Sequence, residues 1–139
     1  MIIRAVPDAE DEELDPVDPL GAIYIENEGG TLLERSVFLD DWFRGLLSGL
    51  RYIRSGEQEA VVDLHSSRDP LIWSVGPAGV VLKYKGRNLP ISHLAQFESA
   101  LREAIIEFTE QYRMHKNWPK CTELPGLREW ALHKHANEH

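Results

Sequence analysis

Apolar residues recur along this chain at two spacings, and each spacing predicts a different kind of element. Short apolar runs and alternating apolar positions are typical of strands, whereas apolar residues three and four positions apart are typical of helices. The first pattern predicts strands over residues 22–25, 31–35, 60–64, 71–75, 80–84 and 88–91. Gly29 and Gly30 can supply the positive φ angles of a hairpin turn between the first two strands.

The second pattern predicts two long helices, over 38–54 and 92–115. The stripe of the first helix consists of Leu39, Trp42, Phe43, Leu46, Leu47, Leu50 and Ile53, and that of the second of Leu94, Phe97, Leu101, Ala104, Ile105, Phe108 and Tyr112. Ser92 is the expected N-cap of the second helix. Gly45 and Gly49 fall opposite the first stripe, where close approach of another segment or ordinary tolerance of glycine would explain them. Residues 127–132 can add a final helical turn or two.

These elements predict an α+β fold. The turns between the strands of 59–91 are too short for βαβ crossovers, which favours an antiparallel meander. Each helix has one apolar stripe and the strands offer an apolar face, so layering them buries both. We therefore expect one domain over residues 20–139, in which an antiparallel sheet of five or six strands packs against two amphipathic helices, followed by a C-terminal tail. The length of 139 residues suits one such domain.

Negative charge is concentrated near the N-terminus. The net charge is −8. Residues 1–50 hold twelve acids and three arginines, a net of −9, and seven of those acids lie between Asp8 and Asp18. Such a segment repels itself and has little to bury, so residues 1–19 are predicted to form an acidic arm whose removal hardly changes stability. The alternative is that Met1–Val6 docks as an edge strand.

Composition also restricts the compartment and the partners. The single cysteine, Cys121, excludes an intrachain disulfide and fits a reducing, cytoplasmic location. No apolar run approaches the ~20 residues of a membrane-spanning helix, and the first residues lack a signal-peptide pattern. The acidic balance argues against a nucleic acid or an anionic membrane surface as partner. No cofactor-binding motif is present, so we expect no cofactor.

Two groups of residues contain metal-binding side chains. His133, His135 and His139 are spaced so that they could ligate a metal, but they lie at the end of the sequence without a carboxylate pair nearby. Cys121 with His115 is half of a zinc site. We expect a solvated tail and a lone thiol, and therefore no metal.

A third group contains the residue types of a hydrolase triad. Asp63, His65, Ser66 and Asp69 are close in sequence, but a triad is a spatial arrangement that sequence proximity does not produce. Strand alternation puts Asp63 and His65 on one side and leaves Ser66 in a turn. We therefore expect no catalytic residues and no enzyme.

The order of segments carries a family resemblance. An acidic leader precedes GAIYIENE, then LDDWFRGLLSGL, then LIWSV and GVVLKYKGRNLPI, and last FESALREAIIEFTEQY. Over residues 20–112 this resembles small immunity proteins of bacterial contact-dependent growth inhibition and related polymorphic toxin systems. The resemblance implies a non-enzymatic, cytoplasmic protein that binds one cognate toxin domain, often a nuclease, and blocks its active site or substrate surface.

Five acidic residues are the candidates for toxin binding. They lie within sixteen residues, at an expected hairpin and helix start: Glu26, Glu28, Glu34, Asp40 and Asp41. Rigid placement lowers the entropy lost on binding, and a nuclease presents a basic surface that acids attract. The alternative for Asp40 and Asp41 is that they only stabilise their helix end.

Three other functions stay open. The protein could be an accessory or scaffolding module of a larger bacterial assembly, for which the acidic arm is equally suitable. An enzyme centred on His65 is a second alternative. A single-stranded nucleic-acid binder is the third, although such grooves need basic charge. The sequence leaves the oligomeric state open.

Overall fold

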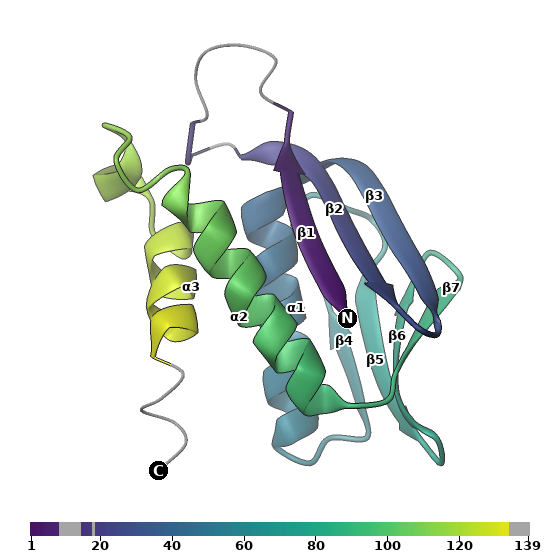
Figure 1. The fold of residues 1–139 in the computed structure, drawn as a ribbon. Coiled ribbons are helices and arrows are strands. Elements are labelled where there is room, and N and C mark those ends of the chain that lie inside the picture. The colour runs from purple at the N-terminus through teal and green to yellow at the C-terminus, as the bar shows by residue number, and fades with distance from the viewer. Residues whose placement is uncertain (9–14, 18, 134–139) are drawn as a thin grey trace.

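The computed structural model describes residues 1–8, 15–17 and 19–133. Figure 1 shows the elements in their order along the chain. They are β1 (Ile2–Pro7), β2 (Leu20–Asn27), β3 (Gly30–Phe38), α1 (Leu39–Arg54), β4 (Glu59–Val62), β5 (Leu71–Gly76), β6 (Gly79–Tyr84), β7 (Arg87–Ile91), α2 (Leu94–Glu110), a short 3-10 helix (Trp118–Lys120) and α3 (Glu123–Leu132). The α+β class is confirmed.

The strands form two antiparallel sheets. β1, β2 and β3 make a three-stranded sheet, and β4 to β7 make a four-stranded meander. The expected single sheet of five or six strands is therefore wrong. The physical reason is α1, which follows β3 directly and packs against strands of both sheets, so the first hairpin does not continue into β4.

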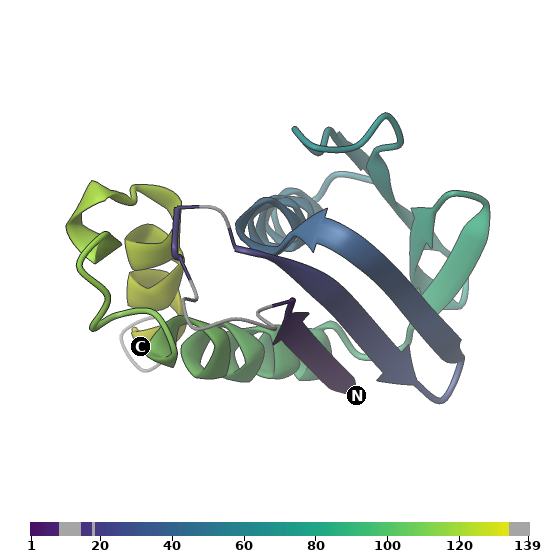
Figure 2. The same ribbon diagram turned by 90° about the horizontal axis from the view of Figure 1, so that it is seen from above.

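The two sheets meet where β3 approaches β7, and side chains join them there. The Arg87 guanidinium donates to the Leu33 carbonyl at 3.0 Å and to Glu34 at 2.7 Å, and the Asn27 amide donates to the Pro90 carbonyl at 2.6 Å. Figure 2 shows the sheets spreading from that side, with α1 seen end-on in the angle between them. One hydrophobic core fills this angle.

α1 packs on two faces, one more than its apolar stripe predicts. The second face is made by Gly45 and Gly49 and lies against β4, β5 and the turn that follows β4. A Cβ atom on Gly49 would lie 2.0 Å from the Trp73 indole nitrogen, and one on Gly45 would lie 2.8 Å from a Leu64 methyl carbon. Close approach, rather than ordinary tolerance, explains both glycines.

Residues 2–7 belong to the three-stranded sheet. β1 pairs with β2 along its whole length, with Ile3 opposite Ile25, and the Ile3 side chain is buried. The predicted arm over 1–19 therefore needs correction, because residues 2–7 form an edge strand with an apolar inner side. Residues 9–14 and 18, which hold five of the seven acids between Asp8 and Asp18, lie outside the described residues.

The C-terminal helices differ from the prediction at their ends. α2 begins at Leu94 after His93, so Ser92 is not its cap, and it ends at Glu110. α3 is longer than expected and packs against α2. Arg102 connects the two, because its guanidinium lies 4.0 Å from the Trp130 ring and donates to the Trp130 carbonyl.

Candidate interaction surface

The three-stranded sheet has one face on the core and one face that no described helix covers. Ile23, Ile25 and Leu32 point inward and are buried, whereas their sequence neighbours point outward. The apolar residues of the outer face are Ile2 and Val6 on β1, Leu20, Ala22 and Tyr24 on β2, and Leu33 and Phe38 on β3. We call these seven residues the sheet face. In Figure 2 its strands lie on the side turned to the viewer.

Several side chains of the sheet face are solvent-exposed. Val6 exposes 53% of its surface, Ile2 44%, Leu20 40% and Phe38 37%. Val17, beside the Phe38 end, exposes 45%. Two arginines are exposed on the same face, Arg4 opposite Tyr24 and Arg35 at the bulge opposite Ala22. Isolated exposed apolar residues are normal on a protein surface, whereas a group of them on one face is a candidate interaction site.

A bulge in β3 turns Phe38 outward. The pairing of β2 with β3 shifts between Gly21 and Ile23, where Arg35 and Ser36 stand opposite Ala22 alone. Ser36 has a φ of 55°, the left-handed conformation that such an extra residue adopts. Without the bulge, Phe38 would share the inner face with Leu32, six residues earlier, because strand side chains alternate with a period of two.

Four of the five candidate acids lie at two separated places, and the fifth, Glu34, lies between them on β3. Glu26 and Glu28 are at the turn between β2 and β3, where Glu26 accepts a hydrogen bond from the Tyr24 hydroxyl and Glu28 is exposed. Asp40 and Asp41 begin α1 at the other end of β3. The nine residues of β3 span roughly 30 Å. These four acids therefore flank the sheet face at both ends, and the five do not form one cluster.

Glu34 joins the two sheets. Its carboxylate lies 2.7 Å from Arg87 and 3.5 Å from Lys85, and only 16% of its side chain is exposed. Both cations belong to the four-stranded sheet or its last turn. Glu34 is thus paired within the protein, and its charge is neutralised before any partner arrives.

Asp41 is likewise held inside the protein. Its carboxylate accepts hydrogen bonds from Arg44 at 2.8 Å, from the Ser66 backbone at 3.0 Å and from the Ser66 hydroxyl at 2.9 Å. Burial alone would raise the pKa of Asp41. Hydrogen bonds from the Arg44 side chain, from the Ser66 backbone and hydroxyl and from the His65 backbone outweigh this effect and lower the pKa. Asp41 therefore fastens the turn after β4 to the start of α1.

Of the two acids at the start of α1, Asp40 is the one whose carboxylate remains available to a partner. It is half-buried, and burial raises its pKa, with the carboxylates of Asp41 and Glu123 raising it further. Its side chain lines a hollow of about 310 Å³ together with Val17, Phe38 and His65. A carboxylate beside exposed apolar groups suits a partner that brings a basic side chain with apolar neighbours.

The residue types of a triad come together in part. Ser66 donates to Asp41, and His65 Nδ1 lies 3.8 Å from the same carboxylate. In a triad the histidine stands between the acid and the nucleophile, whereas here both side chains face the acid. The arrangement is that of a structural turn.

The metal-site candidates are partly described. His135 and His139 lie outside the described residues. Within the described ranges, no group of three or more His, Cys, Asp or Glu side chains is placed to hold a metal ion. Cys121 is a free thiol whose pKa is raised by burial, with Asp15 and Asp40 contributing, and it contacts the Asn117 carbonyl at 3.5 Å.

No family model matches the chain, and neither a curated protein nor a solved structure shows significant similarity to it. None of the helices in the described ranges is long and apolar enough to span a membrane. The function has to be inferred from the described side chains. The strongest feature among them is the sheet face with its flanking carboxylates.

Proposed function

We propose that this protein is a bacterial immunity protein that neutralises a cognate toxin domain by binding it through the sheet face. The observation that carries the proposal is the uncovered outer face of the three-stranded sheet, where exposed apolar residues and two arginines, Arg4 and Arg35, lie between carboxylates at both ends. The proposed contacts at the ends are Glu26, Glu28 and Asp40. Glu34 and Asp41, also expected to bind toxin, instead support the frame that holds this face.

The apolar part of the face supplies the binding free energy. Interfaces bury a central apolar patch that includes aromatic residues, surrounded by polar ones. Tyr24 and Phe38 are the aromatic members here, on adjacent strands of a paired sheet. Because the sheet is rigid, little conformational entropy is lost when a partner covers it.

The flanking carboxylates specify a basic partner. A surface with Lys or Arg at two places about 30 Å apart would match Glu26 and Glu28 at one end and Asp40 at the other. A nuclease domain, whose substrate surface is basic, has the required chemistry.

Neutralisation by this route requires only that the face cover the toxin. A protein seated over the active site or substrate surface excludes the substrate sterically. The second candidate function is an accessory or scaffolding module of a larger bacterial assembly, which would use the same face. A scaffolding module differs from an immunity protein in one measurable way: it would not protect cells from a toxin.

Co-expression tests the proposal. A candidate toxin domain, sought in the gene immediately upstream, is expressed with the parent protein or with the Val6→Asp, Phe38→Asp double variant. Phe38 is the N-cap of α1 and Asp is a favourable N-cap, so this change leaves the helix start intact. The control is Val61→Asp, at a position that is 55% exposed on β4.

We expect the parent and the control to restore growth and to co-purify with the toxin, whereas the double variant does neither. Melting curves establish that all three are folded. Full protection by the folded double variant would exclude the sheet face as the binding surface. Failure of the parent to protect, or to bind, would favour the scaffolding function.

A further inference from the structure

The four-stranded sheet ends at β4, which Figure 1 shows next to α1. The other strand edges within the described residues are covered. Those of β3 and β7 approach each other, and side chains from the opposite sheet donate to the carbonyls of Leu33 and Pro90. α2 packs against β1, whose last residue, Pro7, has no N–H. β4 therefore provides the edge at which backbone groups are open to a partner.

The pairing of β4 with β5 decides which backbone groups point outward. The Val75 N–H donates to the Gln58 carbonyl at 2.9 Å, in the same register as the strand pairs that follow. Every second residue of an antiparallel strand bonds to its neighbour, counting here from Gln58. The N–H and C=O groups of Glu59 and Val61 therefore point away from β5, and they form no hydrogen bond with another described residue. We call these four groups the β4 edge.

The β4 edge is exposed along its length. Glu59 is exposed and Val61 exposes 55% of its surface, whereas Ala60 and Val62 are buried on the side of α1. A row of unpaired backbone donors and acceptors binds an extended segment as an additional strand. The chemistry of the β4 edge therefore selects an extended backbone as its occupant.

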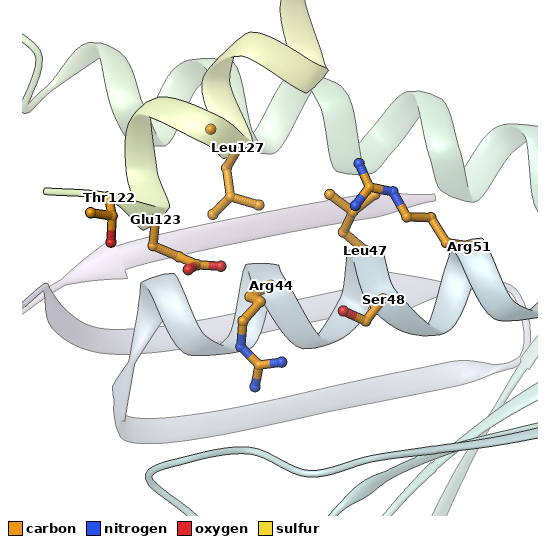
Figure 3. Close-up of a pocket in the computed structure, with 8 residues that line it drawn as sticks. Arg44, Leu47, Ser48, Arg51, Thr122, Glu123 and Leu127 are labelled. Atoms are coloured by element: carbon orange, nitrogen blue, oxygen red, sulfur yellow. The ribbon is translucent and has the colours of Figure 1, made fainter.

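The flank of α1 beside β4 gives an added strand a second surface to contact. Arg44 marks this flank, because its guanidinium donates at 2.8 Å to the carbonyl of Asp63, directly after β4. In Figure 3 the Arg44 guanidinium points away from α3, and Ser48 follows on the next turn. Tyr52, one turn further, is 53% exposed. Ser48 and Tyr52 therefore lie where the inner side chains of an added strand would come.

The outer face of β4 alternates acidic and apolar side chains. Glu59, Val61 and Asp63 lie on this face at every second position, and all three are exposed. Neither carboxylate forms an ion pair within the described part of the chain. Directly opposite residues of adjacent strands share a face, and opposite charges there stabilise the pairing. A basic residue opposite each acid and an apolar residue opposite Val61 therefore suit this face.

We propose that the β4 edge binds an extended segment of another protein as an additional antiparallel strand, with basic, apolar and basic residues at alternate positions. Hydrogen bonds to Glu59 and Val61 hold the segment, and its alternate side chains make it specific. Both strands have the same two-residue period, so each outward side chain meets its counterpart. A second copy of this chain is a poorer occupant, because it brings its own Glu59 and Asp63 to the same face. The β4 edge lies on the other sheet from the sheet face and does not rest on the proposed function.

Peptide titration followed by amide chemical shifts tests the assignment. The probe is acetylated and amidated Lys-Thr-Val-Thr-Lys, and the charge control is Glu-Thr-Val-Thr-Glu with the same blocked ends. We expect the probe to shift the amides of Glu59 and Val61 and to bind at least about tenfold more tightly than the charge control.

Two modified probes test the backbone hydrogen bonds. N-methylation of the probe valine removes the donor to the Val61 carbonyl and should weaken binding about tenfold. N-methylation of its first threonine is the matched control, because that N–H points away from β4, and binding should be unchanged.

Matched variants test the protein side. Val61→Pro removes an outward N–H that the fold does not use and should weaken probe binding about tenfold. Glu59→Lys with Asp63→Lys should reverse the preference between the probe and the charge control, which a loss of structure cannot do. Glu103→Lys with Glu107→Lys makes the same change in charge at exposed positions of α2 and should keep the preference.

Four results would overturn the proposal: equal binding of the probe and the charge control, unchanged binding after N-methylation of the probe valine, shifts confined to residues away from β4, and no binding. Sedimentation that shows a dimer of the parent, dissociated by Val61→Pro, would assign the β4 edge to a second copy and would also overturn it.

A failure of this proposal is distinguishable from a failure of the immunity function. Val6→Asp, Phe38→Asp should lose toxin protection and keep probe binding. Val61→Pro should keep toxin protection and lose probe binding.

Discussion

Asp40 and Asp41 are adjacent residues whose pKa values are shifted in opposite directions. Burial, only partly offset by backbone hydrogen bonds, raises the pKa of Asp40. Hydrogen bonds from Arg44 and Ser66 lower the pKa of Asp41 in spite of its burial. A lowered carboxyl pKa stabilises the folded state above the unfolded value, and a raised one destabilises it there. One residue therefore supports the fold and its neighbour opposes it.

The pH dependence of unfolding separates these two roles. Asp40→Asn should be more stable than the parent at pH 7, and the difference should vanish as the pH falls through the raised pKa of Asp40 toward 3.8. Asp41→Asn should be less stable at pH 7 by about 1–3 kcal/mol, because buried donors lose a charged acceptor. That deficit should shrink below pH 3.8, where Asp41 in the parent becomes protonated.

Urea unfolding between pH 3 and pH 8 measures both variants, with Asp63→Asn as an exposed control. Equal stability of the parent and Asp41→Asn at pH 7 would show that the negative charge of Asp41 adds nothing to the hydrogen bonds that it accepts from Arg44 and Ser66.

Most elements were predictable from the spacing of apolar residues, since α1 and β5 begin and end within a residue or two of their predicted limits. The division into two sheets was not, because it depends on the second packed face of α1. That face is made by Gly45 and Gly49, which leave no apolar signal in the sequence. The side chain that packs against Gly49 is that of Trp73, on β5.

Only the acidic residues of the candidate site were predictable from the sequence. The acids at the hairpin and helix start could be read from the sequence, but their pairing could not, because Glu34 meets Arg87 more than fifty residues away. Phe38 was missed because the bulge at Ser36 decides which way it points. Ile2 and Val6 were not predicted as surface contacts, because the acidic residues that follow them dominate the composition of the N-terminal segment.

Two adjacent isoleucines of β1 test whether this strand packs on the core. Ile3 is 8% exposed and faces the core, whereas Ile2 is 44% exposed on the sheet face. Ile3→Ala should lower the free energy of unfolding by about 2 kcal/mol, and Ile2→Ala by less than about 0.5 kcal/mol. Urea unfolding measures both. Equal small losses would show that β1 contributes no core packing, as an arm over residues 1–19 would require.

At the scale of the whole molecule, the proposed binding would use charge and apolar surface at different steps. The net charge of −8 attracts a basic partner from a distance, an effect that salt screens beyond about 8–10 Å. The sheet face acts only after contact, when its apolar side chains leave water. Association rate and residence time should therefore respond to different substitutions.

Charge reversal tests this division. Glu26→Lys with Glu28→Lys should leave the fold intact, because neither carboxylate is paired with a cation in the described residues, and should slow association with the toxin and weaken its salt dependence. Glu34→Lys should instead lower the melting temperature, because it places a third cation beside Lys85 and Arg87.

Stopped-flow association at low and high salt, with melting curves for each variant, measures these effects. Val6→Asp, Phe38→Asp provides the comparison, since its main effect should be faster dissociation of the toxin. The acidic ends are not toxin contacts if the Glu26→Lys, Glu28→Lys variant associates as fast as the parent at low salt. A binding face on the toxin that is itself acidic would be equally incompatible with them, because like charges at both ends would repel before the apolar residues could meet.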